Sequence, residues 1–394
     1  MKHINMMPNC PICFSSQVKN FFNILDMPVH IGILWPDKSS AENAPVGDIT
    51  LNGCKKCGHI FNSSFIKELM EYDLPYDNSL FFSGVFREYA HQLSTQLIKK
   101  YSLSLKNIVE IGSGLGDFLK LICEQGNNKG WGFDPSYLPD FSPDPVANQL
   151  TFFKGYYQKK LINEKIDFLY SRHTLEHLPN PRELIQQLKK DFDQERDVIF
   201  YFEVPNADFM LRETKIWDLI YEHCQYFTAS SLRYLFEENG FEILDLYETF
   251  DNQYLGIECR ISDEKTKIYP KNTIQDDQII QFSENATNLI WKWRNILSAM
   301  LKDNSKSVVW GAGAKGVSFL NILKMPESNI VGVVDINPRK QGKFIPLTGQ
   351  QIFLPEELKV NQPEQIIVVN SIYLDEIKNI IKQFGLPNDI CISL

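Results

Sequence analysis

Apolar runs alternate with amphipathic segments through most of the chain. Between residues 76 and 262, apolar runs occupy 107–111, 130–133, 167–170, 198–204, 241–246 and 254–261. Segments with apolar residues at helical spacing lie between them, for example at 116–124, 181–190 and 230–239. Strands that alternate with helices predict βαβ units and a parallel sheet. The last two runs have no helix between them, which predicts a hairpin at one edge of that sheet.

The same alternation restarts near the carboxyl end. Residues 262–278 are polar and read as a linker, and a long helix is expected over 279–302. Strands at 307–310, 330–335 and 365–370 then alternate with helices at 316–323 and 375–384. We therefore expect four parts: a small module at 1–75, an α/β domain at 76–262, a linker and connecting helix at 263–304, and a smaller Rossmann-like α/β domain at 305–394.

Composition and charge narrow the class of protein. The 394 residues include 43% apolar and 12% aromatic residues, enough to bury a core in each domain, and the formal net charge is −9. This balance argues against a broadly basic nucleic-acid-binding protein. Neither a membrane span nor an apolar stretch of signal-peptide length is visible. We expect a soluble cytoplasmic protein that acts on a small molecule.

Four of the eight cysteines form two tight pairs. Cys10 and Cys13 make one Cys-x-x-Cys turn, and Cys54 and Cys57 make the other. Two such turns supply the four thiolates of a tetrahedral zinc site, and a closed set of four leaves no open position for catalysis. The spacing predicts structural Zn²⁺ in a zinc-ribbon-like module, with a redox pair or buried thiols as the alternative. We expect His59, close after Cys57, not to be a ligand.

A glycine-rich loop follows the first strand of the middle domain. It reads acid-x-Gly-x-Gly-x-Gly, and a second acid ends the next strand. The residues concerned are Glu110, Gly112, Ser113, Gly114, Gly116 and Asp134. Glycines let a backbone turn sharply and approach a ligand closely, and a carboxylate after the second strand can bind both hydroxyls of a ribose. The loop is one residue tighter than the dinucleotide fingerprint. It resembles motif I of the class I S-adenosylmethionine (SAM)-dependent methyltransferases, in which the loop and first acid line the methionine end of SAM and the second acid holds the ribose.

Titratable side chains follow the fourth and fifth strands of this domain. The fourth strand exits through Arg172 and His173 into a Leu-Glu-His segment that ends at His177, and this edge of an α/β sheet binds ligands. We expect Arg172 and His173 to reach the cofactor carboxylate or the substrate, and His177 to shape the site. An insertion after the fifth strand carries Tyr221, Glu222 and His223.

A histidine suits the removal of a C–H proton, because its pKa lies near the working pH. A neighbouring carboxylate or phenol can orient the imidazole or stabilise an enolate. We therefore expect His223 to be a base assisted by Glu222 and Tyr221, with a buried structural histidine as the alternative.

Together these segments resemble the sugar C-methyltransferase family, over essentially the whole chain. A four-cysteine module, a SAM domain with a Tyr-Glu-His segment and a Rossmann-like carboxyl-terminal domain occur there in this order. Residues 310–321 and 334–342 look like the signature of its carboxyl-terminal domain, and 76–79 resembles its substrate-facing lid, whose tyrosine, here Tyr76, points into the site. Where the family has Tyr-His-Glu-His, this chain has Tyr221, Glu222 and His223, so either one residue is missing or Tyr221 stands where the first histidine would be. A Gly-Gly-Ser-Leu stretch of the family is replaced at 251–255.

The resemblance implies fold and activity. The fold expected is the doubly wound α/β sheet of class I SAM methyltransferases, with a zinc-ribbon-like module before it and a smaller Rossmann-like domain after it. The activity expected is methylation of carbon 3 in a nucleotide-linked 4-ketodeoxysugar through an enolate. Alternatives are O- or N-methylation of another small molecule, or a non-catalytic SAM-binding scaffold; an RNA methyltransferase is disfavoured by the acidic balance.

A second glycine loop lies in the carboxyl-terminal domain. Gly311, Gly313 and Gly316 have the Gly-x-Gly-x-x-Gly spacing, and Asp335 follows 19 residues after Gly316. This pattern alone suggests a dinucleotide. The resemblance implies instead a domain that closes over the substrate, with Lys315 near its phosphates. A purely structural loop is the third interpretation.

Overall fold

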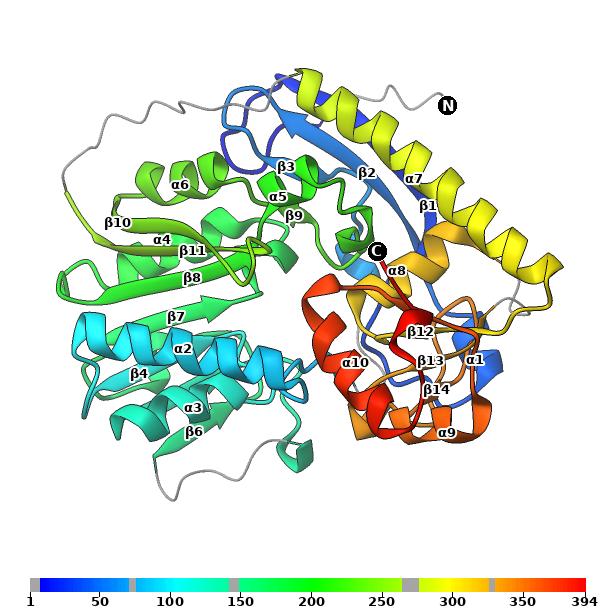
Figure 1. The fold of residues 1–394 in the computed structure, drawn as a ribbon. Helices are drawn as coiled ribbons and strands as arrows, with labels where there is room; N and C mark the ends of the chain where they lie inside the picture. Colours follow the sequence, from blue (N-terminus) through cyan, green and yellow to red (C-terminus); the bar gives the residue numbers. More distant parts are fainter. Residues whose placement is uncertain (1–7, 71–75, 142–148, 264–275, 326–329) are drawn as a thin grey trace.

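The computed structural model describes residues 8–70, 76–141, 149–263, 276–325 and 330–394. Its named strands form three sheets of four, seven and five strands (Figure 1). Most of the linker expected at 262–278 falls on residues 264–275, outside the described residues. Within these ranges, no helix has both the length and the apolar character that crossing a membrane requires.

The first sheet is antiparallel and has the order β1-β2-β3-β9. Its strands are β1 (Val18–Pro28), β2 (Val46–Cys54), β3 (Ile60–Asn62) and β9 (Gln225–Tyr226), and helix α1 (Lys38–Glu42) lies between β1 and β2 in the chain. The fourth strand comes from the insertion of the middle domain, because Ile60 pairs with Tyr226. The amino-terminal module is therefore built partly from the segment that follows His223.

The middle sheet has the order β10-β11-β8-β7-β4-β5-β6. Its strands are β4 (Asn107–Ile111), β5 (Lys129–Phe133), β6 (Leu150–Phe153), β7 (Phe168–Arg172), β8 (Ile199–Pro205), β10 (Phe241–Thr249) and β11 (Tyr254–Ile261). Strand β11 runs antiparallel to β8 and to β10, and the remaining pairs are parallel. The predicted parallel sheet with a hairpin at one edge is confirmed.

Successive side chains of this sheet point to opposite faces, and on each face they pack against helices. Ile108 and Phe168 pack in one cluster with helices α2 (Gly84–Tyr101) and α3 (Asp117–Gly126). Their chain neighbours Val109 and Leu169 pack in the other cluster, with helices α4 (Pro181–Asp191) and α6 (Ala229–Glu238). Such period-two burial on both faces is what a doubly wound sheet requires. Helix α6 starts at a capping box in which Thr228 and Ser231 satisfy each other's backbone N–H groups.

The third sheet is parallel throughout, with the order β14-β13-β12-β15-β16. Its elements are β12 (Ser307–Trp310), α8 (Ala314–Leu323), β13 (Ile330–Val334), β14 (Ile352–Phe353), α9 (Leu358–Asn361), β15 (Gln365–Val368), α10 (Leu374–Gln383) and β16 (Cys391–Ser393). This is the Rossmann-like arrangement that the alternation predicts.

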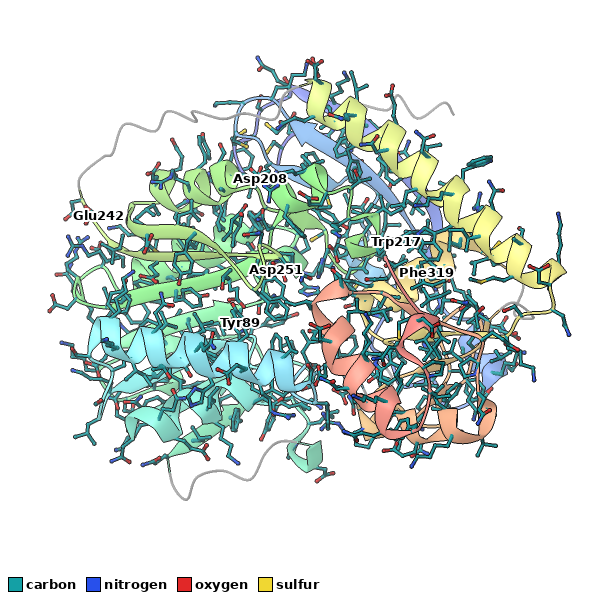
Figure 2. The ribbon with its side chains drawn as sticks, in the orientation of Figure 1. Tyr89, Asp208, Trp217, Glu242, Asp251 and Phe319 are labelled. Atoms are coloured by element: carbon teal, nitrogen blue, oxygen red, sulfur yellow. The ribbon has the colours of Figure 1, made fainter. Side chains whose placement is uncertain are left out.

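A long helix and an aromatic cluster join the three sheets. Helix α7 (Asp276–Lys302) lies along the first sheet, where Phe282 packs edge-on against Phe22 of β1 (Figure 1). Further along, Phe319 of α8 meets Trp293 of α7 and also Trp217, which belongs to the insertion after helix α5 (Ala207–Arg212) (Figure 2). The insertion is thus held between the amino-terminal and carboxyl-terminal parts.

Candidate active site

A large cavity of about 1020 Å³ opens at the carboxyl edge of the middle sheet. Its walls come from the first glycine loop, the 76–86 segment, the exits of β7 and β8, the insertion and the second glycine loop. Ligands of α/β sheets bind at this edge. The chain therefore brings most of the candidate residues to one place, and their contacts decide what each can do.

The first glycine loop is bonded to the acid that follows β5. The Gly114 N–H donates to Asp134 Oδ2 at 2.8 Å, and Ser136 donates to Oδ1 from its N–H and its hydroxyl at 2.7 and 2.6 Å. Gly112 has a φ of +74°, and a side chain there would collide with Thr174. Glu110, Gly112, Ser113, Gly114 and Asp134 line the cavity as expected, whereas Gly116 lies behind the loop against Phe152.

Acidic groups converge on this loop. Glu110 is 4% exposed, and its Oε2 has no hydrogen-bond partner among the described residues. Burial raises the pKa of Glu110 to about 8, the nearby Asp134 and Asp117 add to the rise, and Arg172 opposes it. The buried Ser113 hydroxyl also lacks a described partner. A buried acid without a partner at Oε2, close to two further acids, fits a cationic ligand that would favour its ionised form, and SAM carries both an ammonium and a sulfonium.

Arg172 and His173 meet a buried carboxylate that sequence reasoning missed. Glu203 of β8 is fully buried, and its Oε1 lies 2.8 Å from Arg172 Nη2 and 3.0 Å from His173 Nε2. Its Oε2 accepts from the hydroxyls of Tyr89 and, at 2.8 Å, Tyr201. Although burial opposes ionisation, Arg172 and His173 hold the pKa of Glu203 at about 2. Arg172 and His173 line the cavity, but both also contact Glu203. In the sequence, Glu203 is marked only as a single acid inside an apolar strand.

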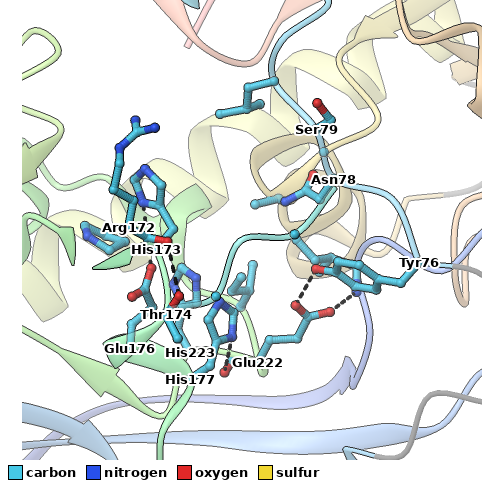
Figure 3. Close-up of a pocket in the computed structure, with 18 of the residues that line it drawn as sticks. Tyr76, Asn78, Ser79, Arg172, His173, Thr174, Glu176, His177, Glu222 and His223 are labelled. Carbon is cyan, nitrogen blue, oxygen red and sulfur yellow. Dashed lines mark hydrogen bonds and ion pairs between the residues drawn. The ribbon is translucent and has the colours of Figure 1, made fainter. Parts of the chain in front are cut away.

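Glu222 is the link between the insertion and the amino-terminal module. Its side chain is fully buried, its Oε1 accepts from the Ile31 N–H and its Oε2 accepts from the Tyr76 hydroxyl, both at 2.7 Å (Figure 3). Burial raises the pKa of Glu222 to about 7, and these two hydrogen bonds oppose the rise. The Tyr76 ring leaves no room for a side chain at Gly32, where a Cβ would lie 2.7 Å from the ring.

The remaining contacts of this segment separate the three insertion residues. His223 lines the cavity beside His177, with ring centroids 4.8 Å apart. Tyr221 does not line the cavity itself: its ring stacks on Phe65, which does, and its hydroxyl accepts from the Ile66 N–H at 2.7 Å. With these contacts, Tyr221 holds the insertion to the amino-terminal module.

Three groups beside the insertion have pKa values shifted by burial. His177 Nδ1 lies 3.1 Å from the Glu222 carbonyl oxygen, and burial lowers the pKa of His177 to about 4. Burial, with the nearby rings of His177 and His173, holds the pKa of His223 well below its usual range. Burial raises the pKa of Glu176 to about 8. Both histidines are therefore neutral near pH 7 and have a lone pair to accept a proton. Sequence reasoning gave Glu176 no role, because the Leu-Glu-His segment is common.

The segment after Tyr76 is tied to both glycine-loop domains. Asp77 is 2% exposed, and its Oδ2 binds Arg339 Nε at 2.7 Å and Asn337 Nδ2 at 2.8 Å in the carboxyl-terminal domain. Ser79 donates from its hydroxyl to Asp117 at the start of α3, at 3.0 Å. The lid-like segment thus bridges the cavity from the insertion to the carboxyl-terminal domain.

The second glycine loop repeats the backbone contact of the first. The Ala312 N–H donates to Asp335 Oδ2 at 2.8 Å. Here the neighbouring charges are positive: Lys340 Nζ lies 3.6 Å from Asp335, and Lys315 lines the cavity in an ion pair with Asp218. The replaced stretch at 251–255 also reaches this domain, because Gln253 Oε1 accepts from Asn370 Nδ2 at 3.0 Å.

The four paired cysteines converge as expected for a metal site. Cys10 and Cys57 have sulfurs 3.6 Å apart, Cys13 and Cys54 have sulfurs 3.5 Å apart, and all four lie within 4.8 Å of one another. Zinc–thiolate bonds of about 2.3 Å give tetrahedral sulfurs about 3.8 Å apart, so the set is compatible with Zn²⁺. His59 is not among them, since its Nε2 binds Gln225 Oε1 at 2.7 Å next to the insertion.

Comparisons with known proteins agree with this organisation. Residues 81–246 match a methyltransferase domain model, and residues 267–386 match a model described as the C-methyltransferase C-terminal domain. The C-methyltransferase NovU of Streptomyces niveus is 22% identical over 298 residues, which cover 70% of this chain and 69% of NovU.

Solved structures that match part of the chain include two methyltransferases. Magnesium protoporphyrin IX methyltransferase from Synechocystis, solved with bound SAH, is 17% identical with a TM-score of 0.35, and the match covers 45% of this chain and 84% of that one. A SAM-dependent methyltransferase from Aquifex aeolicus is 13% identical with a TM-score of 0.32, over 43% and 89% of the two chains. From its matched domains, the chain is a SAM-dependent methyltransferase with a C-methyltransferase C-terminal domain.

Proposed function

We propose that the chain methylates the carbon next to the ketone of a nucleotide-linked 4-ketodeoxysugar. The observation that carries the proposal is the single cavity in which a neutral histidine pair, an acidic glycine loop and a basic glycine loop face one another. SAM, when bound, supplies an electrophilic methyl group. The chain's own residues must then produce a carbon nucleophile and hold the sugar.

His223 is the proposed base. Its buried ring is neutral near pH 7, so its lone pair can accept the proton from the carbon beside the ketone. His173 also lines the cavity. Removal of the proton leaves an enolate, whose negative charge has to be stabilised for the step to be fast.

Tyr76 and Glu222 are the proposed partners of the base. Tyr76 lines the cavity and donates to Glu222, so its hydroxyl is held at the wall where the enolate would form. Glu222 fixes this hydroxyl and, through the Ile31 N–H, the position of the insertion. Tyr221 acts in this scheme through the fold, by anchoring the insertion to the first module.

The two loops divide the ligands by charge. Glu110, Gly112–Gly114 and Asp134 hold SAM in this scheme, with Asp134 on the ribose hydroxyls. Tyr156 and Tyr157 line the same end of the cavity and are the proposed neighbours of the adenine. Lys315 faces the phosphates of the nucleotide sugar from the other side. The four thiols hold structural Zn²⁺ and favour a reducing, cytoplasmic setting.

A mass-spectrometric assay in heavy water tests the proposal. Purified protein is given a panel of nucleotide-linked 4-keto-6-deoxysugars, first without SAM and then with methyl-deuterated SAM. We expect exchange of the adjacent C–H without SAM and a labelled C-methyl product with it. Labelled methyl without exchange would mean O-methylation, and binding of SAM with no transfer would mean another substrate class.

A matched pair of variants assigns the base. His223→Asn should lower turnover and C–H exchange by about 10²- to 10⁴-fold while SAM binding stays within about twofold. His91→Asn, an exposed histidine on α2, should behave as the unmodified protein. Unchanged exchange in His223→Asn would remove His223 from the mechanism.

A further inference from the structure

Two histidines and a carboxylate meet in the cavity outside the four-cysteine module. Single donor atoms of Glu176, His177 and His223 all lie within 4.8 Å of one another. Glu176 and His177 come from the short 3₁₀ helix Leu175–His177 after β7, and His223 comes from the insertion (Figure 3). Two unrelated loops thus present one oxygen and two nitrogens to the same small volume.

The Glu176 carboxylate lacks the contacts that a buried carboxylate normally has. It is 1% exposed, and neither oxygen accepts a hydrogen bond from another described residue. The nearest cationic candidate, His173 Nδ1, is 3.8 Å from Oε1, too far for a hydrogen bond. Buried carboxylates are usually paired or bound to a metal, so this group is left for something that the chain itself does not supply.

His177 is held in the form that a metal requires. Its Nδ1 lies 3.1 Å from the Glu222 carbonyl oxygen, which can only accept, so Nδ1 carries the hydrogen and Nε2 keeps its lone pair. A carbonyl behind the ring is the usual outer partner of a metal-binding histidine, because it fixes the tautomer and the ring plane. His223 Nδ1 is also buried without a described hydrogen-bond partner.

We propose that Glu176, His177 and His223 form a binding site for one divalent first-row transition-metal cation. Imidazole nitrogens with one carboxylate favour cobalt, nickel, iron or zinc over magnesium and calcium, which prefer oxygen ligands alone. Metal–donor bonds of about 2.1 Å place donors up to about 4.2 Å apart, so small side-chain rotations suffice to close the set. The three residues line the cavity, so the remaining coordination positions face it.

Occupancy of this site has a consequence that rests on the proposed function. A cation bound to His223 takes the lone pair that the base needs, so the metal-bound protein cannot remove the substrate proton. The site is therefore an inhibitory one, in which a transition metal and the sugar compete for the same imidazole. Lys315, whose positive charge acts on His223, is itself paired with Asp218.

Binding of Co²⁺ to the zinc-loaded protein tests the site without any turnover. The protein carries His3→Ala, and any affinity tag is removed, so that no imidazole outside the described residues adds a site. We expect one further Co²⁺ per chain, with a visible d–d absorption and no thiolate-to-cobalt charge transfer. Glu176→Gln and His177→Asn should each weaken it about tenfold or more, with zinc content and SAM binding unchanged.

Glu183→Gln is the matched control, since Glu183 is an exposed carboxylate on the wall of the same cavity. It should keep the affinity of the unmodified protein. No second Co²⁺, or a second Co²⁺ that survives both Glu176→Gln and His177→Asn, would overturn the proposal. Because no sugar is present, a failure of sugar methylation would leave this result unaffected, and a failure here would leave the methylation proposal unaffected.

Discussion

The two glycine loops share a backbone device and differ in charge. In each, an N–H of the loop donates at 2.8 Å to the aspartate after the neighbouring strand, Asp134 in the first and Asp335 in the second. The first is surrounded by further acids, whereas Lys340 lies 3.6 Å from Asp335 and Lys315 lines the cavity. The βαβ geometry therefore provides two similar cradles, and in our proposal the side chains around each select a cationic or an anionic ligand.

Among the tests of this comparison, the largest effect should come from replacing the aspartate of the first cradle by alanine. Asp134→Ala removes the proposed ribose contact, and charged hydrogen bonds of this kind are worth about 2.7 kcal/mol, so the SAM Kd should rise about 100-fold. Asp335→Ala should change the SAM Kd less than twofold. Calorimetric titration with SAM measures both, and equal losses in the two variants would mean that the loops are not specialised.

A second change tests whether the amino-terminal module positions Tyr76 and Glu222 beside the proposed base without affecting either glycine loop. A Cβ in Gly32→Ala would displace the Tyr76 ring from Glu222, so kcat should fall about 30-fold, equivalent to about 2 kcal/mol. SAM affinity should stay unchanged. Tyr76→Phe keeps the ring and removes the hydroxyl, and should show the same pattern. A weaker SAM affinity in either variant would place the lid on the cofactor side.

The basic loop is probed by removing its cavity-facing charge. Lys315→Met should raise the KM for the sugar nucleotide about tenfold, because one charge-assisted contact to phosphate is worth about 1.4 kcal/mol. The SAM Kd should not change. Lys382→Met, an exposed lysine on α10, is the control. A rise in the KM of both variants would indicate long-range attraction without a specific phosphate site.

The smallest effect concerns the pH dependence of the acidic loop. The pKa of Glu110 is raised from an ordinary 4.5 to about 8 in the folded protein, so its contribution to stability is complete below about pH 4.5 and is lost as the pH rises to about 8. An ammonium ligand needs the ionised form, so SAM should bind about fivefold tighter at about pH 7.5 than at about pH 6.7. Glu110→Gln should flatten this dependence in calorimetry; an unchanged slope would assign it to another group.

Local patterns were sufficient to predict most of the middle sheet and three of the five strands of the carboxyl-terminal sheet, whereas the short strands β6, β14 and β16 were not among the predicted runs. Periods of two and 3.6 residues reflect burial along each element, so the strands, the helices and the edge hairpin follow from neighbours in the chain. The same holds for the glycine loop and for the cysteine pairs, whose spacing is local. Strand β9 could not be predicted in this way. Its partner Ile60 lies more than 160 residues earlier, and a strand of two residues is too short to show a hydrophobic period.

The sequence predicted which residue types occur at the site better than it predicted where their side chains point. Tyr221 and Glu222 are chain neighbours, and the backbone sends one side chain to Phe65 and the other to Tyr76. Glu203 and Glu176 acquire their importance from burial, since each is held in a low-dielectric pocket that only the assembled fold creates. No spacing rule in a single sequence reports such burial.

The division of the cavity by charge is tested most directly by one structure. Crystals of the zinc-loaded protein would be grown with S-adenosylhomocysteine and a nucleoside diphosphate together. The account predicts the amino group of the first ligand beside Glu110, its ribose on Asp134, and the diphosphate oxygens within hydrogen-bond distance of Lys315. A diphosphate bound at the first loop, or at neither, would contradict it.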